Sequence, residues 1–85
     1  MKYRVLIARA AERELDRLPE AVRRRIASRI LDLENDSRPP GTKKLREREE
    51  YRLRIGSYRV VYEVGDTSRV VVVTAVRHRR EAYRP

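Results

Sequence analysis

The sequence contains no cysteine, no tryptophan and no phenylalanine, and its aromatic residues are five tyrosines. Without cysteine, a disulfide bond, a thiolate zinc site and a cysteine nucleophile are all excluded. Long apolar runs are absent as well, and the four valines of 70–73 form a run far too short to span a bilayer. Met1 leads into strand-like sequence rather than into a signal peptide, so we expect a cytoplasmic protein.

Positive charge dominates what the chain does contain. There are 22 lysines and arginines against 13 aspartates and glutamates, a formal net charge of +9, and 19 of the basic residues are arginines. Because a guanidinium grips phosphate at two points, this composition indicates a polyanionic partner. The 85 residues correspond to a single domain, 1–85, with a thin core, since chains near this size bury only about 60 to 65% of the surface that the unfolded chain exposes.

Regularly spaced apolar residues predict a folded domain rather than a disordered basic chain. Alternation over 2–7 predicts an opening strand, and helical spacing over 8–18 and 19–34 predicts two helices separated at Pro19. The segment 35–42 is rich in proline and glycine and is predicted to be a loop. The expected buried stripes of the two helices are Ala11, Leu15 and Leu18, and Val22, Ile26, Ile30 and Leu33.

From Lys43 onward the apolar period falls to two, which predicts antiparallel strands that include 51–55, 58–64 and 69–77, followed by a basic tail over 78–85. The consecutive valines of the last strand indicate burial on both faces in the middle of the sheet. The fold class is therefore α+β: an N-terminal strand, a helical hairpin, and a three- to four-stranded antiparallel meander with both helices on one sheet face.

The dipeptide Gly56-Ser57 fits a type II′ hairpin turn, which requires glycine at its first central position. This turn places Arg54 directly opposite Arg59, with Arg52 on the same face, while the alternate residues face the helices. Like charges directly across a sheet are destabilising. We interpret this face as a phosphate-binding surface on which an anion relieves the repulsion. The alternative is a solvated arginine face that keeps the sheet soluble, with Glu63 as a counter-charge.

Other motifs that carry chemistry are scarce. There is no glycine-rich phosphate loop, no His-Glu metal motif and no pair of carboxylates at a useful spacing, so no metal and no cofactor are expected. His78 titrates near neutrality and is a candidate acid or base, but nothing brings it together with a serine and an aspartate as a triad. Tyr83 lies outside the periodic strands. The remaining tyrosines alternate with apolar positions and are predicted to be core or rim residues: Tyr3, Tyr51, Tyr58 and Tyr62.

Three segments together carry a family resemblance. The segment Tyr51-Arg-Leu-Arg-Ile-Gly-Ser-Tyr-Arg-Val-Val-Tyr62 is preceded by Lys43-Lys-Leu and followed, after the valine strand, by His78-Arg-Arg-Glu-Ala-Tyr83. This combination resembles the RelE family of bacterial and archaeal toxins in the RelE/ParE superfamily. The resemblance spans nearly the whole chain, because the order of two helices and then strands also agrees.

The resemblance implies a metal-independent endoribonuclease, an mRNA interferase that cleaves codons in the ribosomal A site and so inhibits translation. It also implies an antitoxin encoded beside the toxin, and a toxin–antitoxin complex that reaches operator DNA through that antitoxin. The positions that it implicates in cleavage are Arg52, Arg59, Arg79 and Tyr83. The basic side chains expected to bind RNA beside them are Lys43, Lys44, Arg54, His78 and Arg80.

The chemistry of metal-free RNA cleavage sets three tasks: orienting the 2′-hydroxyl, stabilising the charge of the phosphorane, and protonating the leaving oxygen. Arginine suits the second task, but it exchanges protons poorly because it stays charged above pH 12 or so. Tyr83 is therefore the better candidate for the base, with His78 in reserve. The best-known bacterial members have lysines where this chain has Arg52 and Arg54, which leaves the proton-transfer role open.

Two other function classes remain. A ParE-like member of the superfamily would act on DNA gyrase as a protein-binding module, and a non-catalytic nucleic-acid-binding domain would bind according to phosphate count and salt. Neither needs the combination of Arg59, Arg79 and Tyr83. For a chain of net charge +9, we expect an acidic antitoxin whose binding segment combines Glu and Asp with a helical apolar stripe, covering either the sheet face or the helical hairpin over 8–34.

Overall fold

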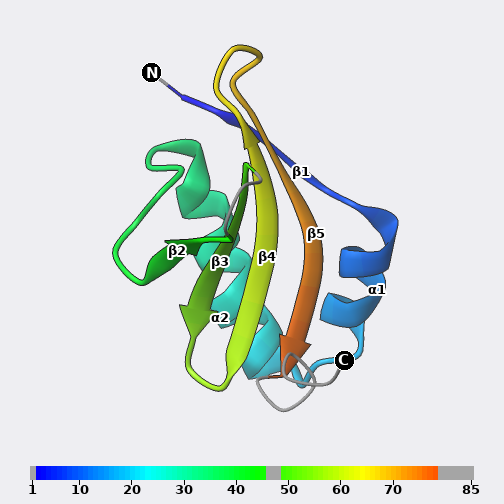
Figure 1. Ribbon diagram of the computed structural model, residues 1–85. Helices are drawn as coiled ribbons and strands as arrows, with labels where there is room; N and C mark the ends of the chain where they lie inside the picture. Colours follow the sequence, from blue (N-terminus) through cyan, green and yellow to red (C-terminus); the bar gives the residue numbers. More distant parts are fainter. Residues whose placement is uncertain (1, 46–48, 79–85) are drawn as a thin grey trace.

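The computed structural model describes residues 2–45 and 49–78, and they form one mixed five-stranded sheet with two helices on one of its faces (Figure 1). The strands are β1 (Arg4–Ile7), β2 (Thr42–Lys44), β3 (Glu50–Ile55), β4 (Tyr58–Gly65) and β5 (Val70–His78). Their order across the sheet is β1-β5-β4-β3-β2. All neighbouring pairs are antiparallel except β1 and β5, which are parallel. The predicted α+β class is confirmed.

The helical hairpin consists of α1 (Arg9–Asp16) and α2 (Glu20–Leu31), and a single 3₁₀ turn, η1 (Asp32–Glu34), follows α2. Both helices are shorter than the periodicity predicts. Pro19 occupies the position before α2 and has an extended ψ, so the helical conformation is interrupted there. This is the position at which the sequence predicts the separation of the two helices. In the described part of the chain, neither helix is long or apolar enough to cross a membrane.

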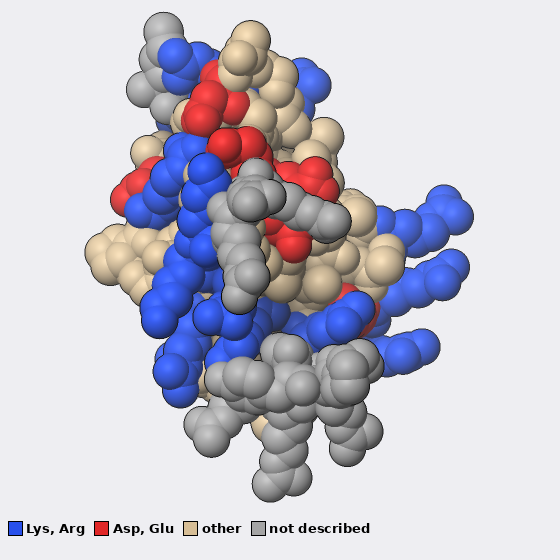
Figure 2. Space-filling view, viewed as in Figure 1, with Lys and Arg blue, Asp and Glu red and all other residues tan. Residues whose placement is uncertain are grey.

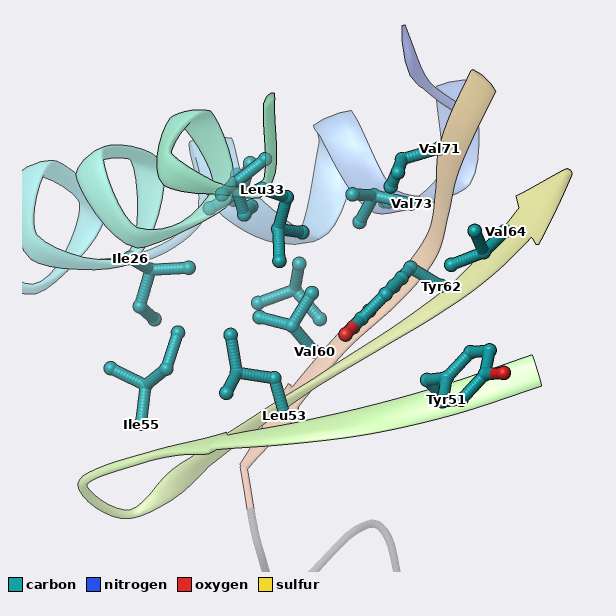
Figure 3. Close-up of a cluster of buried hydrophobic side chains, with 14 residues drawn as sticks. Ile26, Leu33, Tyr51, Leu53, Ile55, Val60, Tyr62, Val64, Val71 and Val73 are labelled. Atoms are coloured by element: carbon teal, nitrogen blue, oxygen red, sulfur yellow. The ribbon is translucent and has the colours of Figure 1, made fainter. Parts of the chain in front are cut away.

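The core lies between the helices and one face of the sheet (Figure 3). The predicted helical stripes are confirmed, because Ala11, Ile26, Ile30 and Leu33 are almost completely buried. The tyrosines behave as predicted as well: Tyr51 and Tyr62 stack in the core with their ring centroids 5.8 Å apart. The buried apolar residues are Ala11, Leu15, Ile26, Ile30, Leu33, Tyr51, Leu53, Ile55, Val60, Tyr62, Val64, Val71, Val73 and Val76.

The valine run lies in the middle of the sheet as predicted, but its two faces differ. Val71 and Val73 point into the core and are fully buried, whereas Val70 and Val72 on the opposite face are only half-buried. The prediction of burial on both faces is therefore wrong for the second face. The reason is that both helices pack on one side, so the other side of the sheet, here called the outer face, has no helical layer among the described residues.

The loop after η1 is fixed to the end of the sheet far from the Gly56-Ser57 turn. Arg38 forms an ion pair of 2.9 Å with Asp66 in the β4–β5 turn, and its Nε donates a hydrogen bond of 2.9 Å to the hydroxyl of Tyr51. Tyr3 donates a further bond of 2.7 Å to the Asp66 carboxylate. The hydrogen bond from Arg38, and to a smaller extent the one from Tyr3, holds the pKa of Asp66 below its ordinary value.

Candidate nucleic-acid interface

The hairpin over β3 and β4 has the predicted register. Ile55 pairs with Tyr58, Leu53 with Val60, and Arg54 with Arg59. Gly56 has a φ of 59°, and Ser57 is not among the residues with positive φ, as a type II′ turn requires. Because strand residues alternate between faces, this register places Arg54 and Arg59 opposite each other on the outer face.

A row of three arginines crosses three strands on that face. Arg59 on β4 lies between Arg54 on β3 and Arg77 on β5, since it pairs with both. Arg52, two residues before Arg54 on the same strand, points to the same face and lies opposite Lys43 of β2. Here Arg52, Arg54, Arg59 and Arg77 are together called the arginine cluster. Figure 2 shows lysine and arginine side chains gathered over this end of the sheet.

Arg77 is the member of the cluster that strand periodicity does not reveal. Continuing the alternation of Val71 and Val73 along β5 would point residue 77 into the core. A register shift between Val61 and Tyr62 leaves Thr74 as an extra residue on β5, with its hydroxyl donating to the Val61 carbonyl over 3.2 Å. Beyond this bulge Val76 becomes the buried residue, and Arg77 turns to the outer face. This change from odd to even buried positions is seen in the structure, and no turn or glycine in the sequence marks the bulge.

Arg59 is much less exposed than a solvated arginine, with 6% of its surface accessible. It lies on the central strand, where the side chains of both neighbouring strands flank it. The interpretation of this face as three solvated arginines therefore does not fit Arg59. Arg52 is half-buried and Arg54 is exposed. The solvent exposure of the cluster therefore increases from Arg59 through Arg52 to Arg54.

Two adjoining hollows share the arginine cluster. The smaller, of about 180 Å³, is lined by Gly41 and by four basic residues: Lys43, Arg52, Arg54 and Arg59. The larger, of about 470 Å³, has the apolar side chains of Leu45, Val61 and Ala75 beside Arg52 and Arg59, and Glu50, Thr74 and Arg77 complete its lining. An anionic group fits the first, and a flat, partly apolar group such as a nucleobase fits the second.

The opposite end of the outer face is acidic. Glu50 pairs directly with Glu63 across β3 and β4, and Glu49 lines the same hollow of about 450 Å³. Most carboxylates and guanidiniums of this sheet face thus gather at different ends, as the red and blue regions of Figure 2 show, and Glu50 lies at the boundary, where it also lines the larger hollow beside Arg52 and Arg59. A phosphate chain is attracted to the end that holds the arginine cluster and repelled from the end that holds Glu50 and Glu63.

Glu14 of α1 anchors the β5 end of the arginine row. β1 pairs with β5 only as far as Val73, so the backbone N–H of Val76 lies on an edge that β1 does not cover. The carboxylate of Glu14 accepts a hydrogen bond of 2.9 Å from this N–H and lies 3.4 Å from the Nε of Arg77. Sequence periodicity did not single out Glu14, because its partners are more than 60 residues away.

Two predicted RNA-binding residues lie away from the cluster. Lys44 pairs with Tyr51, which points into the core, so Lys44 lies on the helical side of the sheet, and its Nζ is 3.2 Å from Glu49. His78 is the last residue of β5 rather than part of a tail, and its ring lies edge-on to Tyr58, 5.2 Å between centroids. Because Tyr58 packs on the core, His78 also lies on the helical side.

The remaining predicted site residues, Arg79, Arg80 and Tyr83, lie outside the described residues. Within residues 2–45 and 49–78, no group of three His, Asp or Glu side chains has an arrangement that would hold a metal ion. The described part of the site therefore consists of the arginine cluster and Lys43, and its chemistry is that of binding and stabilising negative charge.

Comparison with solved structures shows that this fold is shared with toxins. The archaeal RelE–RelB complex from Pyrococcus horikoshii OT3 matches with a TM-score of 0.83 and 32% identity, over 93% of this chain and 97% of that one. The RelBE2 toxin–antitoxin complex from Mycobacterium tuberculosis matches with 0.82 and 28%, over 93% and 100%. A mutant of the E. coli toxin RelE in its free state matches with 0.79 and 29%, over 98% and 88%.

The sequence comparisons give the family. No curated protein matches the chain. A family model matches residues 5–83, and it is described as the ParE toxin of the type II toxin-antitoxin system, parDE. Since this match covers almost the whole chain, and since the fold is shared with solved RelE toxins, the chain belongs to the RelE/ParE superfamily of type II toxins.

Proposed function

We propose that this toxin is a ribosome-dependent mRNA endonuclease, an mRNA interferase that cleaves codons in the ribosomal A site. The observation that carries the proposal is the arginine row on the outer face, where Arg59 is nearly buried between Arg54 and Arg77. Such a row holds like charges opposite one another on three adjacent strands, and a bound phosphodiester offsets the repulsion.

The cleavage step needs a nucleophile that the RNA itself supplies. The 2′-oxygen attacks the adjacent phosphorus, the bond from phosphorus to the 5′-oxygen breaks, and a 2′,3′-cyclic phosphate and a 5′-hydroxyl result. Arg59 and Arg52 line both hollows and are the groups proposed to stabilise the extra negative charge on the phosphorane. The larger hollow would hold a base beside the scissile phosphate.

The proton transfers require other groups, because guanidinium is a poor base. The position of His78 on the helical side of the sheet supports Tyr83 rather than His78 as the group that takes or orients the 2′-hydroxyl proton. Arg79 is the other residue of the 78–85 segment that we propose for cleavage. A site with strong electrostatic stabilisation and a weak base suits a substrate whose geometry the ribosome imposes. The toxin would then act in the cytoplasm, where translation occurs.

The proposed partner is an acidic antitoxin. Several of the matching structures are complexes of RelE toxins with RelB antitoxins. A chain of net charge +9 with an arginine cluster is neutralised best by a segment rich in Glu and Asp that also covers apolar surface. Through such an antitoxin, the complex would also bind operator DNA.

ParE-like inhibition of DNA gyrase is the second candidate, because the matching family model carries that name. Gyrase inhibition requires a protein-binding surface but no base pocket beside a phosphate site. The mRNA endonuclease and the gyrase inhibitor therefore act on different targets, and assays with programmed ribosomes and with gyrase distinguish them.

The test uses purified toxin, ribosomes programmed with a defined mRNA, and mapping of the RNA ends. We expect cleavage within the A-site codon only when ribosomes are present, and intact mRNA when the cognate antitoxin is added. Arg59→Gln should lower the cleavage rate on the order of 10²- to 10³-fold, as loss of one charge-stabilising donor does. Arg4→Gln, an exposed arginine on β1, is the matched control and should leave the rate unchanged.

Two results would contradict the proposal. One is efficient cutting of free RNA at defined sites without ribosomes. The other is intact mRNA on ribosomes together with inhibition of gyrase supercoiling, which would favour the ParE-like function.

A further inference from the structure

An arginine from the helical layer reaches the end of the sheet beside the arginine cluster. The Nη1, Cζ and Nη2 atoms of Arg25 on α2 lie 3.4, 3.7 and 3.8 Å from the point where a Cβ at Gly56 would be. Gly56 suits this position because its φ of 59° favours glycine, and a Cβ added there would be in ordinary van der Waals contact with the Arg25 guanidinium. The Arg25 guanidinium therefore lies against the Gly56-Ser57 turn of the hairpin.

The surroundings of Arg25 differ from those of its neighbour on the same helix. Arg24 forms an ion pair of 2.7 Å with Glu20, one turn earlier on α2. Arg25 forms no ion pair with any described carboxylate, although it is exposed. Its charge is therefore available to an anion that approaches the turn.

The position of Arg25 continues the path of the arginine cluster. Arg54 lies two residues before Gly56 and Arg59 three residues after it, so the row is only about 7 to 10 Å of strand from the turn. This separation is comparable with the distance between neighbouring phosphates of an extended RNA strand. The acidic pair Glu50 and Glu63 repels phosphate from the other end of the face, so a strand lying on the cluster is directed toward the turn.

We propose that Arg25 binds a backbone phosphate of the single-stranded RNA substrate, next to the phosphate held by the arginine cluster. The RNA strand would cross the outer face at Arg59, pass over the Gly56-Ser57 turn and meet Arg25 at the edge of the helical layer. This inference rests on the proposed function for the nature of the strand, but it concerns binding and does not require cleavage.

The test measures binding of a fluorescent single-stranded RNA to the purified toxin by anisotropy over a series of salt concentrations. The slope of log K against log salt is about −0.7 per phosphate neutralised on a single strand. Arg25→Gln should therefore reduce the magnitude of the slope by about 0.7. Arg24→Gln removes the same charge from the same helix and should leave the slope unchanged. Arg25→Lys keeps the charge and should restore the slope.

Three results would overturn the inference. The first is an equal salt slope for Arg25→Gln and Arg24→Gln, and the second is no measurable RNA binding by the unaltered toxin. The third is an unchanged salt slope for Arg25→Gln together with weaker co-sedimentation of this variant with ribosomes. The last would mean that Arg25 meets ribosomal RNA rather than the substrate strand. Failure of the proposed function is distinguishable, because a toxin that cuts no mRNA on ribosomes would still show the selective loss of slope with Arg25→Gln.

Discussion

Replacing Arg54 should raise the stability of the toxin while it weakens RNA binding. Arg54 is exposed and lies directly opposite Arg59, so the pair is repulsive in the free protein. Arg54→Gln removes the repulsion, and Arg54→Glu converts it into an attraction. Stability should therefore rise in the order Arg, Gln, Glu at position 54, and RNA affinity should fall in the same order.

The magnitude follows from cross-strand pair energies. A like-charge pair costs roughly 0.2 to 1 kcal/mol, and an opposite-charge pair contributes a similar amount with the other sign. The full change from Arg54 to Glu is therefore about 1 kcal/mol, within a range of about 0.4 to 2 kcal/mol. For a domain of this size, about 1 kcal/mol corresponds to a rise in Tm of roughly 4 to 8 °C. In 1 M salt, where screening acts over about 3 Å, most of the rise should disappear.

The assay pairs thermal unfolding, followed by circular dichroism, with the salt-dependent RNA binding described above. Arg4→Glu is the matched control, because Arg4 is an exposed strand arginine opposite Val70 rather than opposite another charge. It makes the same change in net charge and should leave Tm nearly unchanged. An unchanged or lower Tm for Arg54→Glu would refute the repulsive pair. A higher Tm with undiminished RNA affinity would refute the arginine cluster as the phosphate site.

Two further predictions concern contacts at the two ends of the sheet. Glu14→Ala should lower mRNA cleavage and speed hydrogen exchange at the Val76 amide, because both contacts of the carboxylate are lost. Glu14→Gln should keep that amide protected, because its side-chain carbonyl oxygen can still accept the hydrogen bond. Equal exchange rates in the two variants would contradict the anchoring role. Because Arg38 and Tyr3 hold the pKa of Asp66 below its ordinary value of 3.8, the stability that this carboxylate contributes is fully present above that pH and is lost as the pH falls through the lowered pKa. Asp66→Asn should thus lower Tm at pH 7, and the difference in Tm should become smaller as the pH falls below 3.8; a difference that stays constant as the pH falls would contradict the prediction.

The parts of the fold that the sequence predicts are those set by neighbours in the chain. The register of the β3–β4 hairpin depends on one turn, and Gly56-Ser57 is enough to specify it, so the facing of Arg54 and Arg59 was predictable. The buried stripes of α1 and α2 follow from helical periodicity in the same way.

The parts that it does not predict depend on contacts between distant segments. The parallel pairing of β1 with β5 has no local signal, because the two strands are separated by most of the chain. Lys44 was expected in the site because it is basic and adjacent to Lys43, but its face depends on the register of β2 with β3, which no tight turn fixes. Arg77 was not among the predicted site residues, and it joins the cluster only because the bulge at Thr74 interrupts the alternation of β5.

The two faces of the sheet separate the requirements of folding from those of function. The helical side carries the core, including Tyr62, Val71 and Val73, while the outer face carries the arginine row. Two adjacent like-charge pairs cost about 0.4 to 2 kcal/mol together, which is small beside a typical domain stability of about 5 to 15 kcal/mol. The core therefore tolerates the row without rearrangement. It follows that substitutions confined to the outer face can change the target of the toxin while the fold, and the side chains that maintain it, stay the same.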